Sequence, residues 1–265
     1  MLCNLHTHTT FCDGASKPEE IVSAAINQGF STIGFSGHGR TDFDLRYCIQ
    51  DMEGYRREIL RLQKEYQDQI QIYLGIEEDA FSPVLRKNYE YIIGSCHYLL
   101  VGNEYFSLDS GPDYFERCLA QFESPLAMAR AYYQTFCHYI HQRKPDIIGH
   151  FDLITKFDEL GTSLFLEDPA YWTLAEEAIR DAAKAGCIFE VNTAAWSKGL
   201  RTAPYPATPL LRVLKECGAK IILSSDSHST ETLSQNFDAA KALLKEIGFS
   251  SLYIYDQKKF KEQAI

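Results

Sequence analysis

Short apolar segments alternate with longer amphipathic ones along this chain. Runs rich in Ile, Val, Leu and aromatic residues, several bounded by glycine, predict seven buried strands, at residues 1–6, 31–38, 71–77, 91–97, 146–151, 187–192 and 220–228. Five longer runs with apolar residues three and four positions apart predict helices, at residues 17–30, 52–67, 124–143, 169–186 and 207–218. This alternation predicts an α/β fold in which right-handed crossovers join parallel strands.

Each predicted strand ends in polar side chains, most of which are potential metal ligands. These side chains are His6 and His8, His38, Glu77, His97, His150, Asn192, and Asp226 with His228. In an open sheet, ligand residues gather at one switch point, whereas a barrel brings every strand end to one mouth. The distribution therefore favours a distorted seven-stranded (β/α)7 TIM-like barrel. No repeat or Gly/Ser linker divides the chain, which predicts a single domain over residues 1–265.

Composition narrows the class of protein. Hydrophobic residues make up 45% and charged residues 23%, as in ordinary globular domains. The formal net charge of -10 disfavours binding to nucleic acid or to an anionic membrane. The eight cysteines form no CxxC motif and are expected to be reduced thiols. No apolar run approaches the roughly 18 residues of a membrane span, and no signal peptide is recognisable, so a cytoplasmic location is expected. The sequence predicts no oligomeric state.

The polar strand ends point to a metal centre. His6 and His8 are two residues apart in an extended segment, so they face the same way. Imidazole and carboxylate ligands together suit zinc, manganese or iron. Nine candidate ligands are predicted: His6, His8, Asp13, His38, Glu77, His97, His150, Asp226 and His228. Nine ligands exceed the needs of one ion, so two or three divalent ions are expected, bridged by Glu77. Glu78 or Asp79 could supply the carboxylate instead of Glu77, although strand parity places Glu78 on the opposite face.

Such a centre indicates phosphate-ester hydrolysis. Adjacent divalent ions lower the pKa of a bridging water and neutralise phosphoryl oxygens. We expect in-line attack by a metal-bridging hydroxide on phosphorus. Asp226 or His228 would orient that hydroxide or pass a proton to the leaving alkoxide.

Basic residues in two loops are candidates for holding the substrate. Lys198 and Arg201 follow the sixth predicted strand and are expected to bind phosphate oxygens, unless they form an ordinary solvated loop. Arg46 is a further candidate, and Asn192 could hold substrate or a metal-bound water. Residues 101–125 exceed an ordinary connection. They are expected either to form a lid that shapes the leaving-group site or to cover the apolar edge of the barrel.

The motifs "HTHTTFCDG", "GHG", "GIEEDAF", "GSCHYL", "GHFDLI", "FEVNT" and "SSDSH" occur in this order over nearly the whole chain. In these motifs the chain resembles the polymerase-and-histidinol-phosphatase (PHP) family of metal-dependent phosphoesterases. The resemblance implies a distorted seven-stranded barrel and a trinuclear site of zinc, manganese or iron, and it favours Asp13 as a ligand. The longer motifs "IIGHFDLITKF", "EVNTAAWSKGLR" and "PYPA" resemble the histidinol-phosphatase branch. That branch implies hydrolysis of L-histidinol phosphate, a small phosphomonoester of histidine biosynthesis. One departure is Gly37, where relatives usually have aspartate.

Three other functions are compatible with parts of the pattern. A PHP phosphoesterase acting on another phosphomonoester, on nucleotides or on oligonucleotide ends is the main alternative. The acidic charge and the lack of a basic stripe disfavour nucleic-acid substrates. An amidohydrolase-type enzyme also begins with HxH, but it usually needs a lysine where Glu77 and His97 occur here. A non-catalytic metal-binding module is disfavoured by the complete ligand set.

Overall fold

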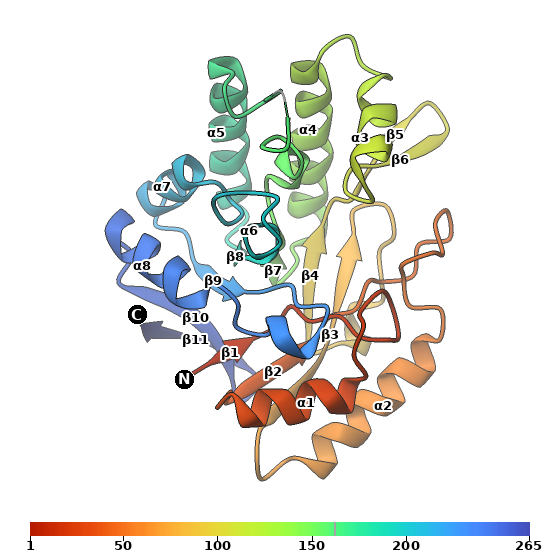
Figure 1. Cartoon of the computed structure of the whole chain (residues 1–265), viewed down its shortest axis with the longest axis vertical. Helices are drawn as coiled ribbons and strands as arrows, with labels where there is room; N and C mark the ends of the chain where they lie inside the picture. The colour runs from red at the N-terminus through yellow and green to blue at the C-terminus, as the bar shows by residue number, and fades with distance from the viewer. Residues whose placement is uncertain (162) are drawn as a thin grey trace.

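A curled sheet surrounded by helices forms the body of the protein in a computed structural model that describes residues 1–161 and 163–265 (Figure 1). Within these residues the sheet has nine strands. Their spatial order is β1 (Cys3–Asn4), β2 (Thr32–Phe35), β3 (Gln71–Asp79), β4 (Tyr91–Ser95), β7 (Ile147–Ile148), β8 (Ile188–Asn192), β9 (Ile221–Ser224), β10 (Ser251–Asp256) and β11 (Lys259–Ala264). Neighbouring strands are parallel except for the antiparallel pair β10–β11. The mixed α/β class is confirmed. The predicted count of seven strands is wrong, because β10 and β11 extend the seven that were predicted.

The chain segments that follow β1 and β9, the first and last of the predicted parallel strands, pair with each other. The backbone amide of His8 donates to the carbonyl of Ser227 at 2.7 Å, and the amide of Ser227 donates to the carbonyl of His6 at 3.1 Å. The segment after β1 therefore lies beside the segment after β9. This pairing brings the polar ends of the first and last predicted strands together.

The C-terminal hairpin packs across the opposite end of the strands. The Tyr255 hydroxyl of β10 donates to the backbone carbonyl of Glu90, and the Gln257 amide donates to the Gln71 side chain. Tyr255 also packs in one apolar cluster with Leu5 of the β1 segment and with residues of β3, β4, β7, β8 and β9. These strands therefore share one buried apolar cluster.

Helices surround the curled sheet (Figure 1). They are α1 (Pro18–Asn27), α2 (Met52–Glu65), α3 (Pro112–Leu119), α4 (Pro125–Arg143), α5 (Pro169–Ala183), α6 (Ala194–Ser197), α7 (Thr208–Glu216) and α8 (Phe237–Ile247), with 3-10 turns at Arg86–Asn88, Leu153–Thr155 and Thr230–Thr232. The five predicted helices correspond to α1, α2, α4, α5 and α7, whereas α3, α6 and α8 were not predicted. In α2, for example, Tyr55, Ile59 and Leu62 are buried, and the Asp51 side chain caps the helix by accepting from the Gly54 amide.

The predicted insertion is an ordered hairpin followed by a helix. Strands β5 (Tyr98–Val101) and β6 (Glu104–Ser107) pair, and α3 packs beside β6 (Figure 1). Phe106 and Phe115 join the main apolar core, and Tyr105 stacks on Phe43 with ring centroids 3.8 Å apart. Most aromatic residues of the insertion therefore cover apolar surface, which is one of the two roles expected for it.

Two further expectations concern the whole chain. None of the helices in the described ranges is both long and apolar enough to cross a membrane. All eight cysteines are free thiols.

Candidate metal centre and cavity

A cavity of about 410 Å³ lies at the carboxyl ends of the strands. Six of the nine predicted ligands line it: Asp13, His38, His97, His150, Asp226 and His228. The other three, His6, His8 and Glu77, lie directly beneath them and are almost fully buried. The structure thus brings together all nine side chains from six separate segments of the chain.

The first two histidines face one pair of carboxylate oxygens. Glu77 Oε2 is 3.3 Å from His6 Nε2 and 3.6 Å from His8 Nε2. Asp226 Oδ1 is 3.6 Å from His6 Nε2 and 3.1 Å from His8 Nε2. Thr7, between the histidines, points the other way and donates its hydroxyl to the Gly34 carbonyl at 2.6 Å. Local strand alternation therefore directs both imidazoles toward the same carboxylates, as the HxH spacing predicts.

Glu77 occupies the middle of the cluster. Its Oε1 is 3.0 Å from His150 Nε2 and 3.3 Å from His97 Nε2, on the side away from the His6 and His8 rings. Its Oε2, beside His6 and His8, is also 2.9 Å from His38 Nδ1. The two oxygens of one carboxylate thus contact different sets of histidines.

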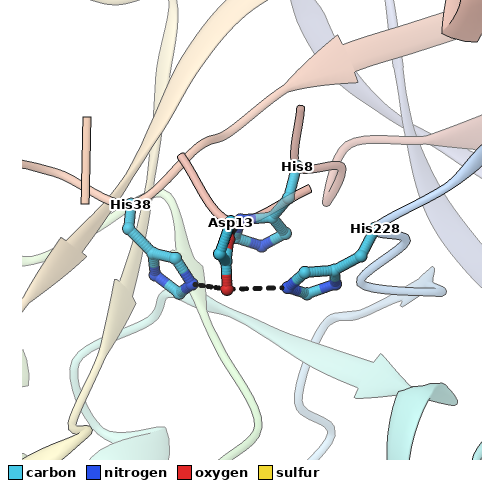
Figure 2. A group of neighbouring side chains, drawn as sticks. All are labelled: His8, Asp13, His38 and His228. Atoms are coloured by element: carbon cyan, nitrogen blue, oxygen red, sulfur yellow. Dashed lines mark hydrogen bonds and ion pairs between the residues drawn. The ribbon is translucent and has the colours of Figure 1, made fainter. Parts of the chain in front are cut away.

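A third group lies at the rim of the cavity. Figure 2 shows the Asp13 carboxylate between the rings of His38 and His228. Asp13 Oδ2 is 3.5 Å from His38 Nε2 and 3.2 Å from His228 Nε2. The His8 ring stacks on His228 with centroids 4.2 Å apart. The potential ligand atoms of these four residues all lie within 4.8 Å of one another.

The donor set fits divalent cations. His6 Nε2, His8 Nε2 and Glu77 Oε2 are buried and have no hydrogen-bond partner within the described part of the chain. Burial lowers the pKa of His8 to about 3, with His228 and His38 adding to the effect, so its ring is neutral and keeps a free lone pair. Burial alone would raise the pKa of Glu77, but His6, His97 and His38 outweigh it and hold that pKa well below its ordinary value. Unpaired buried lone pairs and an anionic carboxylate that converge at one place are what metal coordination requires.

Two carboxylates outside the predicted set orient these ligands. Glu190 Oε1 lies 2.6 Å from His6 Nδ1, and its Oε2 accepts from the His150 backbone amide at 3.0 Å. Asp79 Oδ2 accepts from the His97 amide at 2.9 Å and lies 3.2 Å from His97 Nδ1. Each of these carboxylates fixes which ring nitrogen faces the cluster. Parity was the available signal, because Asp79 is two residues beyond Glu77 on the same strand face.

Glu78 points away from the cluster, as parity predicts. Its Oε1 accepts from the Tyr139 hydroxyl at 2.8 Å, and its Oε2 pairs with Arg143 Nη2 at 2.8 Å. Oε2 also accepts from the Val84 amide at 2.6 Å. Glu78 therefore ties the strand to α4 and to the following loop.

The four predicted substrate residues have different positions. Lys198 and Arg46 line the cavity. Asn192 is buried, and its amide donates to Glu190 at 3.0 Å and to Asp226 at 3.3 Å. Arg201 is also buried and pairs with Asp152 at 3.3 Å. Neither Asn192 nor Arg201 lines the cavity, so each is placed to support a neighbour rather than to touch a ligand.

Tyr205, rather than Arg201, lines the cavity. Its ring lies on the Arg201 guanidinium, 4.4 Å from centroid to Cζ, and it lines the cavity. Its hydroxyl is buried and has no hydrogen-bond partner among the described residues. Sequence reasoning also missed Asp44, Tyr98, Asp109 and Lys156, which line the same cavity.

Gly37 packs against apolar side chains. A Cβ added at this position would lie 2.9 Å from Ile49 Cδ1 and 3.0 Å from Cys12 Sγ. The backbone carbonyl of Gly37 accepts from the Glu77 amide at 3.2 Å. An aspartate here would require its neighbours to move, and it would meet apolar atoms first.

Comparison with known proteins agrees with this geometry. The PHP domain family matches residues 4–194, and the chain belongs to that family. A Schizosaccharomyces pombe protein named "probable histidinol-phosphatase" is 30% identical over 95% of this chain and 89% of its own length. The Bacillus subtilis histidinol-phosphatase is 26% identical over 88% of this chain and 96% of its own length. The crystal structure of Lactococcus lactis histidinol phosphate phosphatase, which contains zinc, L-histidinol and phosphate, matches 98% of both chains with a TM-score of 0.74 at 22% identity.

Proposed function

We propose that the protein is a metal-dependent phosphomonoesterase that hydrolyses L-histidinol phosphate to L-histidinol and phosphate. The observation that carries the reaction class is the placement of Glu77, whose two oxygens contact different sets of histidines. The names of the S. pombe and B. subtilis relatives, and the ligands of the L. lactis structure, support this substrate. In this proposal the predicted parallel strands form a distorted barrel with the site at its mouth, and the β10–β11 hairpin closes the other end.

The nine side chains divide into three ligand groups, two of which share Glu77, for two or three ions of zinc, manganese or iron. The groups are His6, His8, Glu77 and Asp226; Glu77, His97 and His150; and Asp13, His38 and His228. Bound ions would lower the pKa of a coordinated water and neutralise the phosphoryl oxygens. Glu77 is shared between the first two groups and would therefore hold two ions at once.

Side chains of the cavity wall would transfer protons and bind the phosphate. Asp226 and His228 are partly exposed at the cluster, with 15% and 26% of their side-chain surface accessible, so they are positioned to orient the attacking water or to protonate the leaving alkoxide. Lys198 and Arg46 would bind the phosphate oxygens that face away from the cluster. Arg201 acts through Tyr205, whose free hydroxyl is a further donor.

A metal-reconstitution assay tests the proposal. The purified protein is stripped, reloaded with zinc, manganese or iron, and given L-histidinol phosphate, other phosphomonoesters, nucleotides and a single-stranded oligonucleotide. We expect phosphate release only from metal-loaded protein, with the highest kcat/KM on L-histidinol phosphate and at least two ions per chain by elemental analysis. Equal kcat/KM across the phosphomonoesters, or a preference for nucleotides or oligonucleotide ends, would reject the proposed substrate. Full activity of the stripped protein would reject the mechanism.

Glu190→Gln is expected to weaken metal binding by about ten- to a hundredfold. The amide cannot supply the charged acceptor that Glu190 presents to His6 Nδ1 at 2.6 Å. Titration of stripped protein with zinc measures the change, and saturating zinc should restore most of the activity. Glu177→Gln, an exposed substitution on α5, is the control and should titrate like the unaltered protein. An unchanged zinc affinity in Glu190→Gln would contradict the orienting role.

A further inference from the structure

The part of the cavity beyond the cluster contains two carboxylates, Asp44 and Asp109, that the metal groups do not use. Asp44 is already saturated. It accepts from Arg46 Nε at 2.8 Å and from the Tyr98 hydroxyl at 2.9 Å, and only 8% of its side-chain surface is exposed. Asp44 therefore serves to hold Arg46 and has little capacity left for a ligand.

Asp109 is held in place but is not saturated. It lies in the turn between β6 and α3, where Lys156 Nζ donates to its backbone carbonyl at 3.0 Å and to its Oδ2 at 3.2 Å. Its Oδ1 has only a distant contact with Ser107 Oγ at 3.5 Å. With 26% of the side-chain surface exposed on the cavity wall, the carboxylate keeps acceptor positions for a ligand.

The electrostatic setting favours a cation at this position. The Asp109 carboxylate pairs with the Lys156 ammonium at 3.2 Å, and this ion pair favours its anionic form. A carboxylate in a partly enclosed cavity attracts a positive group more strongly than one in open water. Lys156 also lines the cavity, and its two contacts with Asp109 hold the loop.

We propose that Asp109 binds the ammonium group of the substrate, which makes the site selective for phosphomonoesters of amino alcohols. The inference rests on the proposed function, because it takes the phosphate to be held at the cluster and the alcohol part to lie in the outer cavity. An amino alcohol such as L-histidinol carries its ammonium next to the ester-bearing carbon. The cluster and Asp109, which share one cavity wall, are therefore matched to the two ends of a short charged ligand. Lys156 is a positioning residue for Asp109.

A matched pair of substrates separates this role from a general effect on catalysis. Asp109→Asn is assayed in metal-loaded protein with L-histidinol phosphate and with its deamino analogue, 3-(imidazol-4-yl)propyl phosphate. Loss of one charged hydrogen bond should lower kcat/KM for the amino substrate by about ten- to a hundredfold, and that for the deamino analogue by less than about threefold. Competitive inhibition by L-histidinol should weaken by a similar factor. Asp113→Asn is the control, because Asp113 is exposed in the same insertion and does not line the cavity.

The outcomes distinguish failure of the inference from failure of the proposed function. If the unaltered protein prefers the amino substrate and Asp109→Asn keeps that preference, the Asp109 assignment is wrong and the proposed function stands. Equal losses on both substrates at unchanged melting temperature would also overturn the assignment, because they indicate a role in catalysis or loop structure. If the unaltered protein hydrolyses the amino substrate and the deamino analogue equally well, the ammonium site is overturned and the proposed reaction stands. If it hydrolyses neither, the proposed function fails.

Discussion

Glu77→Gln is expected to lower kcat/KM for phosphomonoester hydrolysis by about a thousandfold, with fewer divalent ions retained per chain. The carboxylate contacts His150 and His97 with one oxygen and His6 and His38 with the other. A carboxamide has a single acceptor oxygen, and its NH₂ group would face one of these sets with donors. Steady-state kinetics and elemental analysis of the same preparation measure the two effects together.

The neighbouring residue provides a matched control. Glu78 lies on the same strand, is equally buried, and faces Arg143 and Tyr139 instead of the cluster. Glu78→Gln should lower the free energy of unfolding by about 1–3 kcal/mol, because it weakens a partly buried ion pair. Its metal content and kcat should stay close to those of the unaltered protein. A Glu77→Gln variant that keeps both its ions and its turnover would remove the bridging carboxylate from the proposal.

The parallel part of the fold was predictable because its signals are local. Apolar runs such as 71–77 and 146–151 lie in buried strands, and parallel topology brings their carboxyl ends to one side. Strand β11 escaped prediction because Lys259–Ala264 contains mostly charged and polar residues, whereas β10 has the apolar and aromatic signal of a strand and was overlooked. The hairpin is joined to the sheet by contacts with Gln71 and Glu90. These residues are distant in sequence, so no local sequence pattern predicts the contacts.

The part of the site that lies on strands was predictable from the sequence, and the part that lies on loops was not. The ends of the predicted strands identified eight of the nine clustered side chains, and the first loop added Asp13. Strand parity excluded Glu78, and the same rule places Asp79 on the face of Glu77. No such rule predicts the direction of side chains in the loops. Arg201 turns inward because Asp152, in a separate segment, offers a buried carboxylate, and Tyr205 takes the cavity wall instead. Likewise Asp109 lines the cavity because Lys156 holds its turn, a contact between segments 47 residues apart.

Asp226→Asn is expected to reduce kcat by about a hundred- to a thousandfold while the fold persists. Asp226 Oδ1 lies 3.1 Å from His8 Nε2, and its Oδ2 accepts from the Asn192 amide at 3.3 Å. The substitution removes the negative charge that faces His6 and His8 and leaves the size of the side chain almost unchanged. Turnover, bound metal and melting temperature are measured on the same variant, with the exposed Asp238→Asn as control.

The backbone at Asp226 makes this substitution more informative than an alanine. Asp226 has a φ of 49°, in the left-handed region that Asn and Asp tolerate and that costs other non-glycine residues about 1–2 kcal/mol. Asp226→Ala should therefore lose activity and also melt at a lower temperature, whereas Asp226→Asn should lose activity alone. Near-normal turnover by a fully metal-loaded Asp226→Asn protein would contradict the catalytic role. A loss of melting temperature equal to that of the alanine variant would show that the carboxylate is needed for folding instead.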